Sequence, residues 1–515
     1  MRDARRRVPL TRNRTPTDRI NLMSTVERSP STATFVLPAA QIAGRAVRTH
    51  SDTAGAPIFN ASTGATIGWQ EFATAAHVDD AVRAARDAFA GWRDTPPAER
   101  GRLLAAIAER VEAERARLAA LQMQVSGKPP FEADADVGDV AATFAYYASL
   151  CADPATFAAE AVALPSESFA AERFYDAVGV AALIVPWNFP MVTTAWKLAP
   201  ALAAGCTVVL KPSELTSPAE HALLEIVAAA GVPAGVVNVV NGGADVGAAL
   251  TAHPQIDKIS FTGSTAAGRH VMRAAAADMK RVTLELGGKS ALIVRDDADL
   301  ELAVSLAVAG AFTNAGQMCS ATARILVHDS VYRRFMAAFE TAVRALVVAP
   351  PDVADVAMGP LISAAQRARV EAMLQQGIDA GARVAFSGRV ADTGGDGYFM
   401  APVVIAEPAA DNVLWTDEVF GPVACVKSFR TDDEAIALAN DTRYGLVATV
   451  VTRDAAAARQ FQARVRAGLV WINAPQLIYP HVCWGGFGLS GIGRELGVAG
   501  LRSYQELRHA MRALD

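Results

Sequence analysis

Apolar and polar positions along the chain change their spacing at about residue 163. From Val78 to Trp92 the apolar residues recur at helical spacing, which predicts an amphipathic helix. The same spacing predicts a second helix after Thr95-Pro96, where a proline fits the first helical turn. Beyond Ala163, short apolar runs alternate with helical segments. Strand–helix alternation with short connections predicts an α/β fold with a parallel, doubly wound sheet, the usual binding platform for a dinucleotide.

The elements expected in this alternating region fall into two blocks. The first block contains predicted strands at 178–185, 207–210, 236–240, 256–261 and 282–286, with predicted helices at 193–204, 218–230 and 264–276. The second block contains predicted strands at 291–294, 325–328, 403–405, 423–429, 448–452 and 470–473. In an open α/β sheet, ligands bind at the carboxyl ends of the strands, so polar residues at those ends are the first candidates for a site.

Composition narrows the class of protein. A chain of 515 residues is too long for one core, which predicts two or three domains. The net charge of −5 gives no long-range attraction for nucleic acid or anionic membranes. The apolar run Leu302–Phe312 is shorter than the roughly 18 residues of a spanning helix. Five scattered cysteines without a C-x-x-C pair argue against a disulfide framework or a thiolate metal site. These features predict a cytoplasmic enzyme without a metal.

The first 30 residues differ from the rest of the chain. They hold eight arginines and almost no periodic apolar pattern. Such a segment is either an organelle-targeting sequence or a disordered tail, and Met23 offers an alternative start. Because Pro9 and Pro16 interrupt an amphipathic helix, we expect a disordered basic tail.

Two predicted strand ends carry candidate cofactor residues. Gly263 permits a tight turn, and Ser264 caps the next helix, whose free N–H groups would seat a phosphate. Lys211 and Glu214 follow another strand and could hold a ribose diol. A carboxylate there repels a 2′-phosphate, which favours NAD over NADP. An ordinary strand–helix turn and a solvated loop would explain the same two patterns without a ligand.

Three further residues suggest catalysis. Glu285 follows a strand and precedes two glycines, where a partly desolvated carboxylate can act as a general base. Asn188 lies between two prolines and two aromatic residues, which could aim its amide at an oxyanion, although a rigid turn explains the same pattern. Cys319 ends a polar, glycine-containing stretch typical of a nucleophile, whereas a small core residue is the alternative.

Taken together, these stretches resemble the aldehyde dehydrogenase superfamily from about residue 31 to the C-terminus. The base and nucleophile are 319 − 285 = 34 residues apart, and Asp417–Pro422 and Ser490–Gly497 resemble family signatures in the family's order. The resemblance implies a Rossmann-like NAD-binding domain, a second α/β catalytic domain and a small β oligomerisation extension. After the tail at 1–30, the NAD-binding domain would comprise 31–162 and 180–286. The catalytic domain would comprise 287–494, and the oligomerisation extension 163–179 and 495–515.

The resemblance also implies roles for individual residues. Cys319 would attack the aldehyde, the Asn188 amide would hold the oxyanion, and Glu285 would activate water against the thioester. The implied NAD contacts are Trp187, Lys211, Ser213, Glu214, Gly263, Ser264, Leu286, Glu418 and Phe420. The implied substrate pocket consists of Phe189, Trp196, Thr313, Met318, Leu469 and Trp484.

The pocket is similar to that of the betaine-aldehyde and aminoaldehyde branch, where an aromatic box holds a cationic head group. Thr313 replaces one aromatic wall of that box and Leu469 narrows it, so an apolar aliphatic or aromatic aldehyde stays possible as the substrate. A CoA-acylating semialdehyde dehydrogenase and a catalytically silent binding protein also stay open as functions. We expect a small-molecule aldehyde as the partner and a homodimer or homotetramer as the assembly.

Overall fold

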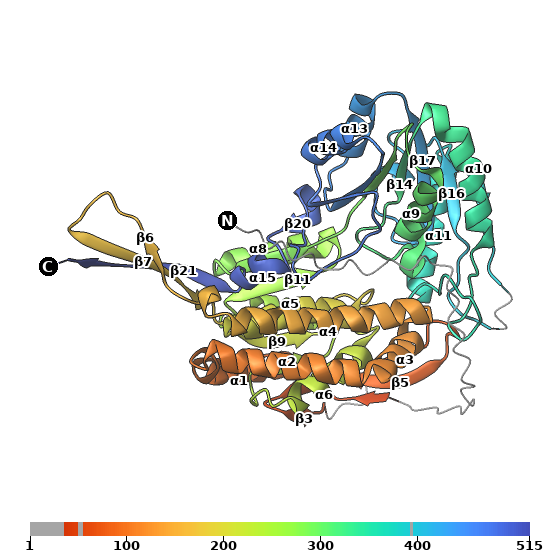
Figure 1. The fold of residues 1–515 in the computed structure, drawn as a ribbon. Helices are drawn as coiled ribbons and strands as arrows, with labels where there is room; N and C mark the ends of the chain where they lie inside the picture. The colour runs from red at the N-terminus through yellow and green to blue at the C-terminus, as the bar shows by residue number, and fades with distance from the viewer. Residues whose placement is uncertain (1–34, 50–54, 392–394, 515) are drawn as a thin grey trace, which may run out of the picture. The chain divides into compact units, whose positions relative to one another are not determined.

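The computed structural model describes residues 35–49, 55–391 and 395–514, and the predicted basic tail lies outside them. These residues form two large sheets, which are flanked by helices, and two three-stranded sheets (Figure 1). One small sheet contains β1 (Phe35–Leu37), β5 (Thr66–Glu71) and β4 (Gly55–Phe59). Within the described part of the chain, no helix is long and apolar enough to cross a membrane.

The eight-stranded sheet has the order β20-β12-β11-β8-β9-β10-β2-β3. Its central strands are β8 (Val180–Ile184), β9 (Thr207–Lys211), β10 (Val237–Val240), β11 (Lys258–Thr262) and β12 (Arg281–Glu285). They run parallel, and β2 (Ala40–Ile42), β3 (Arg45–Val47) and β20 (Gly491–Ile492) extend the two edges antiparallel. The strand order reverses between β8 and β11, which makes their carboxyl ends the expected ligand site. The predicted α/β fold is confirmed.

Helices cover this sheet because apolar residues recur along one face of each. Val78, Ala81, Val82 and Ala85 of α1 (Ala75–Arg93) are buried, and Thr74 caps the helix. The others are α2 (Pro97–Ala113), α3 (Arg115–Ser126), α4 (Pro130–Ala152), α5 (Pro190–Ala204), α6 (Ser217–Ala229), α7 (Ala244–Ala252) and α8 (Thr265–Ala277). Helix α5 begins three residues before its predicted start because Pro190 occupies its first turn. Helix α4 lies between α2 and α5 (Figure 1).

The seven-stranded sheet has the order β15-β16-β17-β14-β13-β18-β19 and forms a second core. Its strands are β13 (Ala291–Val294), β14 (Arg324–His328), β15 (Arg383–Ser387), β16 (Val403–Ala406), β17 (Val423–Phe429), β18 (Val447–Val451) and β19 (Leu469–Ile472). All pairs are parallel except β15 with β16. The accompanying helices are α9 (Leu300–Phe312), α10 (Asp329–Ala345), α11 (Ala364–Asp379), α12 (Val413–Thr416), α13 (Asp432–Asn440) and α14 (Ala455–Arg464).

The remaining sheet pairs β21 (Gln505–Ala513) with β7 (Phe169–Ala177) and β7 with β6 (Glu160–Val162), all antiparallel. It extends away from the two large sheets (Figure 1). Within the predicted extension, 163–179 and 495–515, the strands of this sheet are β7 and β21. The segment 163–168, which contains Pro165, connects β6 to β7, and Leu501 belongs to the short helix α15 (Gly497–Arg502).

Candidate active site

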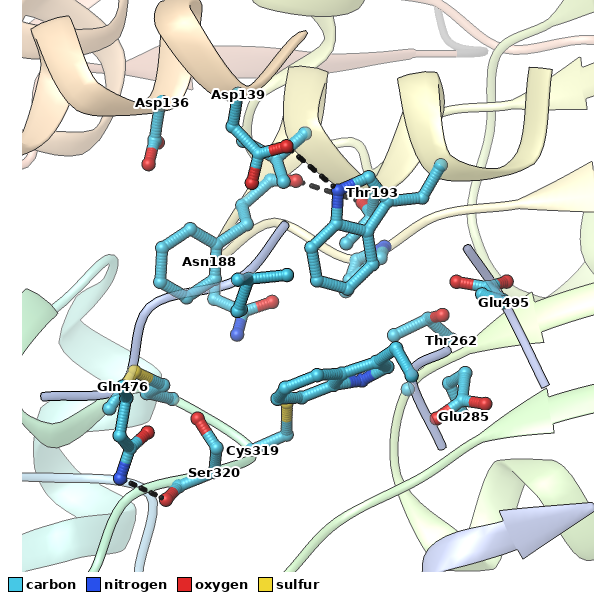
Figure 2. Close-up of a pocket in the computed structure, with 18 of the residues that line it drawn as sticks. Asp136, Asp139, Asn188, Thr193, Thr262, Glu285, Cys319, Ser320, Gln476 and Glu495 are labelled. Carbon is cyan, nitrogen blue, oxygen red and sulfur yellow. Dashed lines mark hydrogen bonds between the residues drawn. The ribbon is translucent and has the colours of Figure 1, made fainter. Parts of the chain in front are cut away.

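A cavity of about 650 Å³ opens at the carboxyl ends of β8, β11 and β12. The segments that follow these strands meet there with the turn after α9 and with a C-terminal loop, 476–480 (Figure 2). The lining includes these predicted site residues: Trp187, Asn188, Phe189, Trp196, Gly263, Ser264, Glu285, Leu286, Met318, Cys319, Glu418, Phe420 and Trp484. Five predicted residues lie outside the lining, namely Lys211, Ser213, Glu214, Thr313 and Leu469.

The turn that leads to Cys319 has an unusual backbone. Asn314 and Ala315 have φ of 51° and 55°, a left-handed conformation that costs a non-glycine residue about 1–3 kcal/mol. Gly316 follows at φ 71°, and a side chain there would collide with the carbonyl of Gly421. The Nδ2 of Asn314 donates to the carbonyls of Asn188 (3.0 Å) and Gln317 (3.2 Å). These contacts join the Asn188 loop to the turn and bring Cys319 into the cavity.

Burial dominates the chemistry of the Cys319 thiol. Its pKa is raised to about 12, first by burial and then by the charges of Glu418 and Glu285. The backbone N–H groups of Cys319 and Ser320 oppose this shift. Such N–H groups are the donors that a developing oxyanion requires. The Asn188 Nδ2 adds a third donor nearby, and in this structure it donates to the Gln317 carbonyl at 3.0 Å.

Glu285 ends β12 with its carboxyl group buried in the cavity wall. Both carboxyl oxygens lack a hydrogen-bond partner among the described residues. A side chain at Gly485 would come within 2.7 Å of Oε1, so only glycine leaves room for this carboxyl. Burial, together with the nearby Glu495, raises the pKa of Glu285 well above its ordinary value. An unsatisfied carboxyl of raised pKa has the character of a general base.

A buried ion pair lies beside Glu285. Lys197 of α5 donates to Glu495, and its Nζ also donates to Thr262 Oγ1 at 2.6 Å. Ser260 Oγ donates to the same Glu495 oxygen at 3.0 Å. The positive charge of Lys197 lowers the pKa of Glu285, which partly offsets the effect of Glu495. Residues Thr262, Glu285 and Glu495 lie together on one side of the cavity (Figure 2).

The residues expected to hold a cofactor border the same cavity. Glu418 Oε1 accepts from the Gly288 N–H at 3.0 Å, and burial raises the pKa of Glu418 to about 7. The Phe420 ring packs edge-on against Trp187 with centroids 5.3 Å apart. Ser264 caps α8 by accepting from the Ala267 N–H at 3.2 Å, which leaves the helix N-terminus facing the cavity. A carboxylate for a ribose, aromatic rings for a planar base and a helix N-terminus for a phosphate together fit a dinucleotide.

Two carboxyl groups of α4 lie across the cavity from Cys319 and Ser320 (Figure 2). Asp136 forms an ion pair with Lys128 at 2.5 Å. Asp139 instead accepts from two neutral donors, the Trp196 Nε1 and the Thr143 Oγ1, both at 3.1 Å. No ion pair joins Asp139 to a basic side chain of the described residues, and burial raises its pKa to about 6. This end of the cavity therefore holds an uncompensated carboxyl group.

The Trp196 indole that donates to Asp139 belongs to a group of aromatic rings at the cavity. The Trp196 and Trp484 rings are 5.5 Å apart, and Trp471 packs behind Trp484 at 6.4 Å. Phe189 differs from these, because the Nζ of Lys128 lies 3.9 Å from its ring centroid. One face of Phe189 is thus occupied by a cation of the protein itself.

Several cavity residues were not among those expected from the sequence. They are Asp136, Asp139, Gln476 and Glu495. A signal for the first two exists, because the prolines at 129 and 130 start a helix that places both carboxyls one turn apart. The glycine-rich segment from Gly486 to Gly491 does not border the cavity, and Gly491 pairs with Glu285 at the sheet edge. In the described residues no cluster of metal-ligating side chains occurs.

Comparisons with known proteins cover nearly the whole chain. A family model described as "Aldehyde dehydrogenase family" matches residues 47–510. Betaine aldehyde dehydrogenase 1 of Oryza sativa subsp. japonica is 42% identical over 458 residues, which cover 88% of this chain and 91% of the relative. Aminoaldehyde dehydrogenase 2 of Zea mays is 41% identical over 455 residues, or 87% and 90% of the two chains. A crystal structure of betaine aldehyde dehydrogenase from Staphylococcus aureus in complex with NAD⁺ has a TM-score of 0.88 at 36% identity, covering 92% and 94%.

Proposed function

The chain belongs to the aldehyde dehydrogenase family and is an NAD-dependent oxidoreductase, and from this premise we propose that it oxidises an aldehyde with a cationic head group to the carboxylic acid. The resemblance predicted from the sequence is confirmed at the level of the family. The cationic substrate and the roles of individual residues are our proposal.

In the proposed mechanism, Cys319 Sγ bonds to the aldehyde carbon. Burial favours the thiol form of Cys319, and because the side chain is only partly buried, its proton passes to solvent as the bond forms. The oxyanion is held by the Asn188 amide and the Cys319 backbone N–H. When bound, NAD⁺ supplies the acceptor for the hydride that leaves the aldehyde carbon. Glu285 then takes a proton from water, which attacks the resulting thioester and releases the acid and the thiol.

The cofactor would be held by residues of both large sheets. Gly263 and Ser264 would receive a phosphate, Glu418 a ribose, and Trp187, Leu286 and Phe420 the nicotinamide ring. Lys211, Ser213 and Glu214 lie outside the cavity at the end of β9, where Lys211 and Glu214 form a loose ion pair at 3.8 Å. We propose that these three residues receive the adenosine ribose, since β9 neighbours β8 in the sheet.

The observation that carries the cationic substrate is Asp139. Asp139 is partly buried and has no counter-charge, which is costly for a carboxylate, and a bound cation would reduce that cost. An apolar aldehyde would instead leave the carboxylate without a counter-charge. The Trp196 and Trp484 rings beside it add cation–π attraction of about 0.5–2 kcal/mol. Because a primary ammonium can donate hydrogen bonds to Asp139, we place aminoaldehydes first and betaine aldehyde second.

A comparison of three substrates tests this proposal. NADH formation is measured with 4-aminobutanal, betaine aldehyde and hexanal, and kcat/KM is compared. We expect both cationic aldehydes to exceed hexanal by about tenfold or more, since a hydrogen bond from the ammonium of 4-aminobutanal to a carboxylate contributes about 1.5–3 kcal/mol and cation–π attraction of either cation about 0.5–2 kcal/mol. A higher kcat/KM for hexanal would contradict the cationic substrate. Adding CoA should leave the free acid as the product, whereas acyl-CoA would support an acylating enzyme.

We also retain the predicted assembly, location and domain limits as proposals. The exposed side chains of Phe169, Leu507 and Met511 on the small sheet β21-β7-β6 support pairing with a second copy in a dimer or tetramer.

The five cysteines are free thiols, which supports a cytoplasmic location. Two relatives carry "chloroplastic" and "peroxisomal" in their names. Sheet membership supports the division at about residue 287, because β12 and β13 belong to different sheets.

A further inference from the structure

A buried carboxyl group lies next to the turn that leads to Cys319, outside the cavity lining. Helix α4 contributes Glu132, which is buried and does not line the cavity. Its Oε1 accepts from the backbone N–H of Asn314 at 3.0 Å. Asn314 is the first left-handed residue of the turn that leads to Cys319. A single side-chain contact therefore links α4 to the backbone of the nucleophile turn.

We propose that Glu132 is a positioning residue that fixes the nucleophile turn by accepting the Asn314 N–H. A left-handed backbone at Asn314 and Ala315 persists only when its surroundings impose it. The Asn314 side chain bonds the carbonyls of Asn188 and Gln317, and its carbonyl accepts from Gln317, so Glu132 supplies the remaining bond, the one to the Asn314 backbone N–H. Without that acceptor, the buried N–H would be unpaired, and the turn would relax.

The surroundings of Glu132 agree with this role. Lys128 and Asp136 lie one turn before and after Glu132 on the same face, and they pair with each other at 2.5 Å. Lys128 also packs its Nζ on the ring of Phe189, the neighbour of Asn188. Burial raises the pKa of Glu132 to about 7, whereas the Asn314 N–H and Lys128 lower it. Lys128, just before α4, thus contacts Phe189 in the Asn188 loop, and Glu132 in the first turn of α4 contacts Asn314 in the turn that leads to Cys319.

Two variants of nearly equal size separate positioning from other roles. Glu132→Gln keeps a carbonyl acceptor for the Asn314 N–H, whereas Glu132→Leu removes it. We expect Glu132→Leu to lower kcat by about 10- to 100-fold, the effect of misplacing a reacting group, with KM for aldehyde and NAD⁺ nearly unchanged. Its Cys319 should also react more slowly with iodoacetamide. Glu132→Gln should restore both rates to near those of the wild type.

Three outcomes would overturn the proposal: wild-type kcat in Glu132→Leu, equal losses in Glu132→Gln and Glu132→Leu, or a rise in KM for cationic aldehydes alone. NAD⁺ binding and the melting temperature establish that each variant is folded. If Glu132→Leu does not fold, Glu132→Asp takes its place, because its shorter side chain cannot reach the N–H and should slow both rates. Asp134→Asn on the exposed face of α4 is the control.

This inference rests on the proposed function but fails separately from it. If the wild-type enzyme forms no NADH with any aldehyde, the proposed function fails. The rate at which iodoacetamide alkylates Cys319 still compares the variants in that case, because alkylation requires neither substrate nor cofactor. Equal alkylation rates in the wild type and Glu132→Leu would contradict the positioning role alone.

Discussion

The carboxyl groups at the two ends of the cavity have different hydrogen-bond and ion-pair partners. At the reaction end, Glu285 has no hydrogen-bond partner in the described structure, while the ion pair of Lys197 and Glu495 lies next to it. At the opposite end, which we call the recognition end, Asp136 forms an ion pair with Lys128. Asp139 accepts hydrogen bonds from neutral donors alone among the described residues. We propose that the carboxyl at the first end acts as a general base and that the carboxyl at the second end binds the cationic group of the substrate.

The role of a carboxyl group in the cavity therefore cannot be inferred from its burial alone and depends on which groups contact it. Burial raises the pKa of both Glu285 and Asp139, so a raised pKa alone does not separate their roles. The groups that contact each carboxyl separate the two roles. Glu285 lies beside the ion pair of Lys197 and Glu495 and has no hydrogen-bond partner among the described residues, whereas Asp139 accepts hydrogen bonds from the Trp196 indole and the Thr143 hydroxyl. Changes at the reaction end should therefore alter kcat, and changes at the recognition end should alter KM for charged substrates.

Replacement of the nucleophile should have the largest effect. Cys319→Ala should lower NADH formation by about 10⁵-fold or more, because a covalent catalyst loses its first step. NAD⁺ binding, followed by fluorescence quenching, should persist. Cys483→Ala is a matched control, since that cysteine does not line the cavity. Turnover of Cys319→Ala measurably above background would contradict the role of Cys319 as the nucleophile.

Loss of the oxyanion donor should come next. Asn188→Asp keeps the shape of the side chain but removes its N–H donors, and we expect kcat to fall by about 10²- to 10³-fold with little change in KM. The rate of hydride transfer, measured by stopped-flow absorbance of NADH, is the appropriate readout. If Asn188→Asp changed only KM, Asn188 would contribute to substrate binding and not to oxyanion stabilisation, which would contradict the proposed difference between the two ends of the cavity.

A smaller, selective effect is expected at the recognition end. Asp139→Asn keeps an oxygen that accepts from the Trp196 Nε1 but removes the charge. It should raise KM for 4-aminobutanal by about tenfold, which corresponds to about 1.4 kcal/mol, and leave kcat and the KM for hexanal nearly unchanged. Asp134→Asn, on the exposed side of the same helix, serves as the control. Equal changes for the charged and the neutral aldehyde would show that Asp139 does not recognise a cation.

The smallest effect concerns stability. Because burial raises the pKa of Glu285 above the value near 4.5 expected in the unfolded chain, the folded state binds a proton more tightly. Folded-state stability therefore falls as pH rises from about 4.5 through the raised pKa. Glu285→Gln cannot ionise, so its melting temperature should exceed that of the wild type by about 2 °C or more at pH 8 and match it near pH 4.5. An advantage of the variant that shrinks as pH rises would contradict this account.

Much of the fold and site could be predicted because strand ends are encoded locally. Short apolar runs locate β8, β11 and β12, and the polar residues that follow them are the ones that line the cavity. The partners of those residues could not be predicted in the same way. Glu495 meets Lys197 across 298 positions of sequence, and Asn314 meets Glu132 across 182. Such pairs depend on tertiary packing, to which no periodic pattern points.

We propose that Cys319 carries the acyl group and that Glu285 helps to hydrolyse it. The most direct test uses Glu285→Gln mixed with excess 4-aminobutanal and NAD⁺, with NADH absorbance and the intact protein mass recorded over time. We predict a burst of NADH equal to the enzyme present, followed by slow turnover, and a protein whose mass has increased by one acyl group located on Cys319. Steady turnover at the wild-type rate with an unmodified protein mass would contradict the account.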